Sequence, residues 1–354
     1  SRIETSPLQF DKNRSALAKR TAIQQIDVNA AMGSIMRDRI EQSGLLPRLR
    51  GFRNNGRQYD EISWMLKRLT GLRDLSLEWP RASAHNSASQ LEKLLDLSNI
   101  RRITSLRFAL PYSDFDSTSV PLGMVIADAP WDKLKHLCLS LSSASSETER
   151  ALLMGPIMKR IQTLEVVSSH SAPLIEALPR LSHLRALKIL FQIGSSSQTT
   201  IEKLAPCHNL RSLSLLALAN EDLRPLTQSP MMDHLTDLEL NRAVNRLAND
   251  RVEELIRSGR LTNLRRLTIA TENANLLLPT IVKSNLLPNL RHLVMPTLEP
   301  SRSDVQLVAE SNIKTLTVTE QAPPAFDNLK RDFLPELRLM RWSYSLVCGS
   351  RLSL

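Results

Sequence analysis

Residues 261–269 read LTNLRRLTI and place Leu261, Leu264, Leu267 and Ile269 at successive intervals of three, three and two. Neighbouring side chains of a β-strand point to opposite faces of the sheet. Leu267 and Ile269 therefore face one side together, and the residues between them face the other. The stretch predicts a short strand with one buried aliphatic face.

The same pattern recurs along nearly the whole chain, with successive copies 23 to 31 residues apart. A degenerate first copy is LLPRLRGF at 45–52, and the last and weakest copy is ELRLMRW at 336–342, with its marker at Met340. The copies between them are LTGLRDLSL (69–77), ITSLRF (103–108), WDKLKHLCL (131–139), IQTLEV (161–166), LSHLRALKI (181–189), NLRSLSL (209–215), HLTDLEL (234–240), LTNLRRLTI (261–269), LPNLRHLVM (287–295) and NIKTLTV (312–318). So regular a recurrence predicts a repeat array, in which stacked neighbours cover the apolar face that no single repeat buries alone.

These repeats resemble the leucine-rich-repeat superfamily over roughly residues 45–343. The resemblance implies an α/β solenoid of 11–12 repeats, with a curved parallel sheet inside and short helices and turns outside. Repeats of this length are similar to the ribonuclease-inhibitor type. The Asn or Cys that the family commonly carries three residues after the last leucine is missing here, and its place is taken by Pro80, Ser142, Gln192, Leu218, Ala243, Glu272 and Leu298.

The composition agrees with one thin aliphatic layer that is renewed in every repeat. The chain of 354 residues contains 63 Leu, 7 Phe, 4 Trp, 3 Tyr and 10 Gly, and 23% of it is charged. No apolar run reaches the 18 or so residues of a membrane helix, and the N-terminal residues are polar. We expect a cytoplasmic protein with no membrane partner, and three distant cysteines argue against a disulfide framework.

The formal net charge of +10 suggests an acidic partner only if the positive charge gathers on one surface. Residues 1–60 hold 11 Lys and Arg against 6 Asp and Glu, and residues 329–354 hold 5 against 2. The array between these flanks is nearly neutral. This distribution weakens the case for a nucleic-acid groove along the repeats.

The two ends differ from the repeats. Residues 1–44 carry apolar side chains at helical spacing, with Gly44 as a plausible stop, and are predicted to form a helical cap or an interaction arm. Residues 344–354 have no repeat pattern and are interpreted as a C-terminal tail or the remnant of a cap. Residues 45–343 form the predicted repeat domain.

The sequence offers little for catalysis. It has no phosphate-binding loop, dinucleotide fingerprint, zinc-protease motif, Cys-x-x-Cys pair or nucleophile elbow. Cys207 and His208 are adjacent, so their side chains diverge in an extended segment and are expected to play no catalytic part. We expect no catalytic, cofactor-binding or metal site, no cofactor, and no small-molecule substrate.

A basic residue follows the first leucine of the strand motif in nine of the repeats. Stacked strands would bring these residues into one file, which we call the basic column. The column either binds a polyanion or covers the apolar strand edge with long side-chain stems, and the near-neutral array favours the second interpretation. Its members are Arg50, Arg73, Lys135, Arg185, Arg211, Arg265, Arg291, Lys314 and Arg338.

Two groups of residues are candidates for partner binding. The first lies in the long loops that follow the early strands, where aromatic side chains stand beside acidic ones: Trp79, Tyr112, Asp114, Phe115 and Asp116. Each of these aromatics has an alternative role in packing. The second group faces the expected concave side of the sheet: Asp74, His136, Lys188, Asp237, Glu239, Arg266 and His292.

These features favour a non-enzymatic protein-interaction module that recognises a protein partner through its concave sheet and the loops of its N-terminal half. One alternative is a target-recognition subunit of a ubiquitin-ligase, effector or immune assembly. The other is binding of nucleic acid or another polyanion through the basic column and the flanks, which the charge distribution makes the weaker hypothesis.

Overall fold

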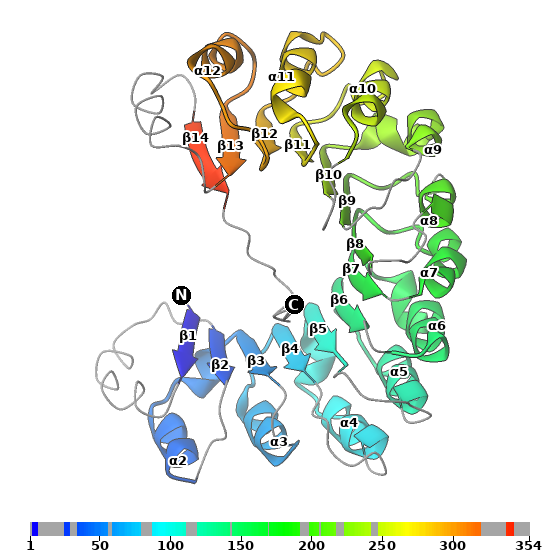
Figure 1. Ribbon diagram of the computed structural model, residues 1–354. Helices are drawn as coiled ribbons and strands as arrows, with labels where there is room; N and C mark the ends of the chain where they lie inside the picture. Colours follow the sequence, from blue (N-terminus) through cyan, green and yellow to red (C-terminus); the bar gives the residue numbers. More distant parts are fainter. Residues whose placement is uncertain are drawn as a thin grey trace. The chain divides into compact units, whose positions relative to one another are not determined.

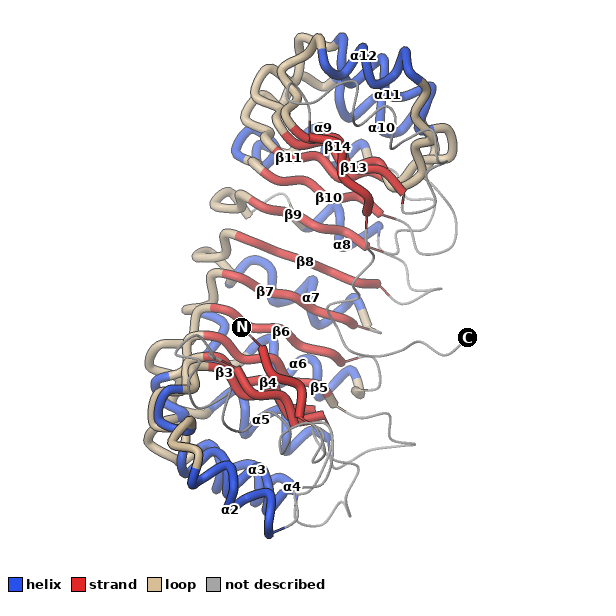
Figure 2. The backbone as a smooth tube through the Cα atoms, turned by 90° about the vertical axis from the view of Figure 1, so that its left-hand side faces the viewer, coloured by secondary structure: helices blue, strands red, loops and turns tan. Residues whose placement is uncertain are grey.

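A computed structural model describes most of the chain: residues 2–5, 25–28, 34–55, 59–78, 87–110, 119–141, 144–168, 170–191, 198–204, 207–216, 223–241, 247–319 and 338–342. The chain divides into two compact units, Ser1–His183 and Leu184–Leu354. In both units parallel strands alternate with helices, and the helices cover one face of the strands (Figures 1 and 2). The opposite face of the strands is called the open sheet face below.

Unit 1 begins and ends its described sheet with the strands β1 and β7. Its strands are β1 (Arg2–Thr5), β2 (Gln25–Val28), β3 (Gly51–Asn55), β4 (Asp74–Glu78), β5 (Ser105–Ala109), β6 (His136–Leu141) and β7 (Thr163–Ser168). Its helices are α2 (Ser34–Gln42), α3 (Tyr59–Arg68), α4 (Ser87–Leu95), α5 (Ser119–Asp128), α6 (Ser146–Met154) and α7 (Ser171–Ala177). Short 3₁₀ turns lead into several strands: η1 (Leu46–Arg48), η3 (Ile100–Arg102), η4 (Pro156–Lys159) and η5 (Leu178–Arg180).

Unit 2 repeats the same alternation of strand and helix. Its strands are β8 (Ala186–Phe191), β9 (Ser212–Leu216), β10 (Asp237–Asn241), β11 (Arg266–Ile269), β12 (His292–Met295), β13 (Thr315–Thr319) and β14 (Arg338–Trp342). Its helices are α8 (Gln198–Lys203), α9 (Arg224–Gln228), α10 (Asn249–Arg257), α11 (Ala274–Lys283) and α12 (Arg302–Ala309), together with the 3₁₀ turn η6 (Pro230–His234).

The strand register confirms the repeat pattern. In unit 1 the paired residues are Ile26, Phe52, Leu75, Leu106, Leu137 and Leu164. In unit 2 they are Leu187, Leu213, Leu238, Leu267, Leu293 and Leu316. Each of these side chains is at most 3% exposed. Stacked aliphatic side chains therefore form the core of each unit, as the sequence predicts.

The last repeat is shifted by one residue from its predicted place. Leu316 pairs with Leu339, and Thr315 pairs with Arg338, so Leu339 rather than Met340 continues the column of leucines. Arg338 therefore holds the first strand position, and its assignment to the basic column is corrected.

The N-terminal segment is not purely helical, contrary to the prediction for residues 1–44. It contains the strands β1 and β2, which pair in parallel with each other and continue to β3. Among the described residues of this segment, α2 is helical, and Gly44 follows it with a φ of 66°, a conformation that glycine adopts without strain. These two four-residue strands were not predicted because neither carries the leucine motif.

Two asparagines join neighbouring repeats at the turn that enters a strand. The side-chain amide of Asn263 donates to the carbonyl of Asp233 at 2.7 Å, and that of Asn289 donates to the carbonyl of Thr262 at 2.8 Å. Both residues stand directly before the first leucine of their motif. Turn carbonyls of one repeat are thus satisfied by the next repeat at this end of the strand.

Candidate functional site

All seven residues predicted for the concave sheet lie on strands, and the alternation of side chains places them on the open sheet face. Unit 1 carries Asp74 on β4 and His136 on β6, and unit 2 carries the other five: Lys188 (β8), Asp237 and Glu239 (β10), Arg266 (β11) and His292 (β12). The structure brings three of these together in one hollow.

The hollow lies on the open sheet face of unit 2 and encloses about 260 Å³. Within its lining, β9 contributes two serines to the open sheet face, whereas β10 contributes two longer carboxylate side chains and β11 contributes an arginine. It is called the β9–β12 hollow, and its lining residues are Ser212, Leu213, Ser214, Asp237, Leu238, Glu239, Arg266, Thr268 and Val294.

Strand register explains how residues far apart in sequence meet in this hollow. Asp237 lies between Ser212 and Arg266 on the neighbouring strands. Glu239 lies in the same way between Ser214 and Thr268. The two carboxylates project from the same face of β10 because they are two residues apart.

Hydroxyl groups orient both carboxylates. The hydroxyl of Ser214 donates to Oε2 of Glu239 at 2.6 Å, and Oγ1 of Thr236 lies 2.8 Å from Oδ2 of Asp237 and donates to it. Hydrogen bonds to a charged acceptor are short and fix its direction. Both carboxylates are therefore held in place before any partner arrives.

A positively charged side chain lies near one of the two carboxylates, that of Asp237. Nε of Arg266 lies 3.8 Å from Oδ1 of Asp237, and both side chains are about half exposed, at 59% and 43%. A long, exposed pair of this kind contributes little energy. Within the part of the chain that the structure describes, no salt bridge reaches Glu239, so the hollow keeps a net negative charge at its centre.

The candidates on the open sheet face of unit 1 form a looser group. Asp74 and His136 occupy equivalent positions on β4 and β6, with Ser105 of β5 between them. Partial burial raises the pKa of the Asp74 carboxyl, and the nearby charges of His136 and Arg73 oppose that rise. A weak ion pair of 3.9 Å joins Arg107 of β5 to Glu165 of β7.

His292 and Lys188 flank the β9–β12 hollow without lining it. His292 is in register with Arg266, and its Nδ1 lies 3.2 Å from the hydroxyl of Thr315. Lys188 is in register with Ser214. The sequence did not single out Ser212, Ser214, Thr268 or Val294, although an alignment of the repeats would have set them beside the charged residues.

The candidate loop residues lie outside the described residues. These are Trp79, Tyr112, Asp114, Phe115 and Asp116, so their assignment to partner binding stays a prediction.

The basic column is held to the backbone of neighbouring repeats. The amide of Arg73 donates to the carbonyl of Arg50, that of Arg211 to the carbonyl of Arg185, and that of Lys314 to the carbonyl of Arg291, each at 2.7 Å. Side chains take part as well: Nη1 of Arg50 donates to the carbonyl of Gly71 at 3.0 Å, and Nη1 of Arg291 donates to that of Leu290 at 3.1 Å. A backbone amide bonds in this way whatever its side chain, so only the side-chain bonds of Arg50 and Arg291 bear on the role of the basic groups, and they favour the structural interpretation of the column.

Comparison with known proteins gives matches by structure alone. No protein-family model matches the sequence, and no curated protein does so either. Among solved structures, the yeast Rad7 chain in complex with Elc1 is similar at 13% identity with a TM-score of 0.51, covering 96% of this chain and 84% of that one.

Two further structures match with lower scores. An LRR protein of Leptospira interrogans has 12% identity and a TM-score of 0.32, covering 95% of this chain and 99% of that one. Toll of Drosophila, from its complex with Spatzle, has 14% identity and a TM-score of 0.35, covering 91% of this chain and 36% of that one.

Each strand from β4 to β13 carries a buried leucine at the equivalent position, and a helix follows each strand from β4 to β12. The chain has the leucine-rich-repeat fold. Within a leucine-rich-repeat solenoid the open sheet face is formed by side chains from successive repeats. The β9–β12 hollow is such a surface, since four repeats contribute to it.

No helix in the described ranges is long and apolar enough to cross a membrane. No three or more His, Cys, Asp or Glu side chains among these residues are grouped so that they could hold a metal ion.

Cys207 is expected to be unreactive in the folded protein. Its side chain is 6% exposed, and burial raises the pKa of its thiol from 9.0 to about 11. Only about one thiol in a thousand is then ionised at pH 8. We predict that iodoacetamide does not modify Cys207 at pH 8 until urea unfolds the chain, as followed by peptide mass spectrometry. Rapid labelling of the native protein would contradict this.

The raised pKa of the Cys207 thiol also predicts how the free energy of unfolding changes at alkaline pH. The folded state holds the proton more tightly than the unfolded state, so stability decreases as pH rises from 9.0 towards 11. Cys207→Ala should remove this part of the pH dependence when urea midpoints are compared across that range.

Proposed function

We propose that this chain is a protein-interaction module whose β9–β12 hollow receives a basic side chain of a protein partner. The observation that carries the proposal is the pair of oriented carboxylates, Asp237 and Glu239, in a hollow of about 260 Å³ on an open sheet face. Arginine matches such a site well, because its planar guanidinium offers several donors to carboxylate and hydroxyl oxygens.

The geometry supports recognition more than simple charge attraction. Ser214 and Thr236 hold the carboxylates in fixed directions. The two side chains therefore lose less conformational entropy when a partner binds. Arg266 stands on one side of the hollow and opposes a second positive group there. The site therefore discriminates by position as well as by charge.

The loop residues named from the sequence remain part of the proposal. Trp79, Tyr112, Phe115 and the two aspartates beside them combine aromatic and acidic side chains, which are typical anchors of protein interfaces. Their contribution is tested separately by comparing Trp79→Ala/Phe115→Ala with the wild type in the capture experiment below.

The test is quantitative affinity capture with three baits. Wild type is compared with Asp237→Asn/Glu239→Gln and with a control, Asp250→Asn/Glu310→Gln, which removes the same charge from an exposed residue of α10 and an exposed residue directly after α12. Proteins retained by wild type and by the control should decrease about tenfold on the hollow variant, since it loses two charged contacts. Equal retention on all baits, or no specific protein on the wild type, would overturn the proposal.

A second candidate is a target-recognition subunit of a ubiquitin-ligase, effector or immune assembly. The similarity in fold to Rad7, which was solved together with Elc1, favours a role within an assembly. This candidate expects two classes of captured protein. A target is lost from the hollow variant, whereas an assembly partner is retained by it, and the absence of the second class would contradict the candidate.

A further inference from the structure

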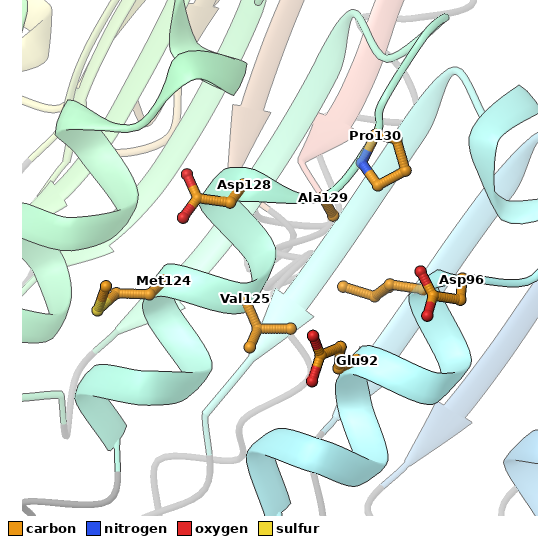
Figure 3. Close-up of a pocket in the computed structure, with 8 residues that line it drawn as sticks. Glu92, Asp96, Met124, Val125, Asp128, Ala129 and Pro130 are labelled. Carbon is orange, nitrogen blue, oxygen red and sulfur yellow. The ribbon is translucent and has the colours of Figure 1, made fainter.

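A second recessed surface lies on the helical side of unit 1, between α4 and α5. It encloses about 250 Å³ and is called the α4–α5 groove. Figure 3 shows Glu92 of α4 and Val125 of α5 on opposite sides of it. Its lining residues are Glu92, Leu95, Asp96, Met124, Val125, Asp128, Ala129 and Pro130.

The groove exists because α5 packs more closely against α6 than against α4. Two glycines allow that approach. A Cβ on Gly123 would lie 3.0 Å from the carbonyl oxygen of Thr148 on α6, and a Cβ on Gly155 would lie 2.4 Å from the Cβ of Ala127 on α5. With α5 held towards α6, the space on its other side stays open.

Trp131 holds the C-terminal end of α5 in place, and its side chain is 4% exposed. Its indole Nε1 donates to the carbonyl of Ile126 at 2.6 Å. This bond satisfies one of the carbonyls that a helix leaves free at its C-terminal end. The wall of the groove formed by Met124, Val125 and Asp128 is therefore preformed.

The groove combines an apolar floor with an exposed methionine. Leu95 is buried at 4% exposure, Val125 is half-buried, and Met124 is 52% exposed. A large apolar side chain gains free energy when it leaves water, and methionine adapts its shape to many partners. Met124 is thus suited to cover an apolar side chain from another molecule.

Three exposed carboxylates rim this floor, and no Lys, Arg or His is among the lining residues. Asp96 directly follows α4, and Asp128 is the last residue of α5. The C-terminal end of a helix is already the negative end of its dipole, so an acidic residue there is unfavourable and adds to the local negative potential. Glu92 extends this potential along α4.

We propose that the α4–α5 groove binds a segment of a partner protein in which an apolar side chain is flanked by Lys or Arg. The apolar side chain lies on Leu95, Met124 and Val125, and the basic side chains pair with the carboxylates of Glu92, Asp96 and Asp128. The charge complementarity selects a basic segment over an acidic one. This surface is separate from the β9–β12 hollow and does not depend on the function proposed for it.

The proposal is tested with labelled model peptides and fluorescence anisotropy. The probe is a helical peptide of Leu and Lys with leucines on one face, compared with a Leu/Glu peptide and a Ser/Lys peptide of the same length. Wild type should bind the Leu/Lys probe about tenfold more tightly than either of the others, because only that probe matches both the charge and the floor. Binding should weaken as salt is raised.

Variants locate the binding site. The triple variant Glu92→Gln/Asp96→Asn/Asp128→Asn should bind the Leu/Lys probe about tenfold more weakly than the wild type does. The variant Met124→Ser should bind it about threefold more weakly. A control that removes three exposed carboxylates from unit 2, Glu202→Gln/Asp250→Asn/Glu310→Gln, should retain wild-type affinity. Equal weakening by the control, or no effect of the groove variants, would overturn the proposal.

Discussion

Leu267→Ala is expected to lower the free energy of unfolding by about 3 kcal/mol. Leu267 is 1% exposed and is paired in register with Leu238 on one side and Leu293 on the other. Truncation removes apolar contacts in three adjacent repeats at once and leaves a cavity that the stacked strands cannot collapse to fill. Urea unfolding followed by circular dichroism measures the loss.

The matched control is Leu276→Ala, because Leu276 of α11 is 71% exposed. The same chemical change at that position should alter stability by less than about 0.5 kcal/mol. Hydrogen exchange should show the loss for Leu267→Ala concentrated in β10, β11 and β12, since stability in a repeat array depends on nearest neighbours. Comparable losses for the two variants would contradict the assignment of the leucine column to the core.

Gly155→Ala is expected to destabilise unit 1 by about 2 kcal/mol. The added Cβ would lie 2.4 Å from the Cβ of Ala127, closer than real atoms approach, and 3.1 Å from its Cα, which is a tight contact. The φ of Gly155 is −67°, which any residue adopts, so the expected loss comes from the packing of α5 and not from backbone strain. Thermal and urea unfolding both report it.

A double-mutant cycle distinguishes this cause from others. Ala127→Gly removes the atom that the new Cβ would strike, at a cost in helix propensity of about 1 kcal/mol. In the double variant Ala127→Gly/Gly155→Ala the two losses should not add, because the clash is gone. Additive losses would show that Gly155 acts through something other than contact with α5.

The repeat pattern predicted the core because it is local. Each motif places its own leucines on one face of its own strand, so Leu75, Leu106 and their successors could be identified without knowledge of any neighbour. The pattern failed where a strand departs from the motif. In β14 the residue that pairs with Leu316 is Leu339 and not the predicted Met340. The strands β1 and β2 are too short and too poor in leucine to be recognised.

The N-terminal strands show why such departures are difficult to predict. Asn54 of β3 occupies the position that Leu77 holds on β4, and it is 1% exposed. Asp27 of β2 is also fully buried. Buried polar residues do not follow the hydrophobic pattern on which strand prediction depends, and their burial is decided by the repeats on either side.

The sequence by itself determined the leucine-rich-repeat fold, where most strands lie, and which charged residues face the open side of the sheet. The tertiary structure decided which of those residues meet. Asp237, Glu239 and Arg266 share a hollow because register sets Asp237 between Ser212 and Arg266, and Glu239 beside Ser214, although these residues lie on different repeats. The α4–α5 groove depends in the same way on how closely α5 packs against α6, since the depth of a surface is set by distances between elements and by small side chains on neighbouring ones.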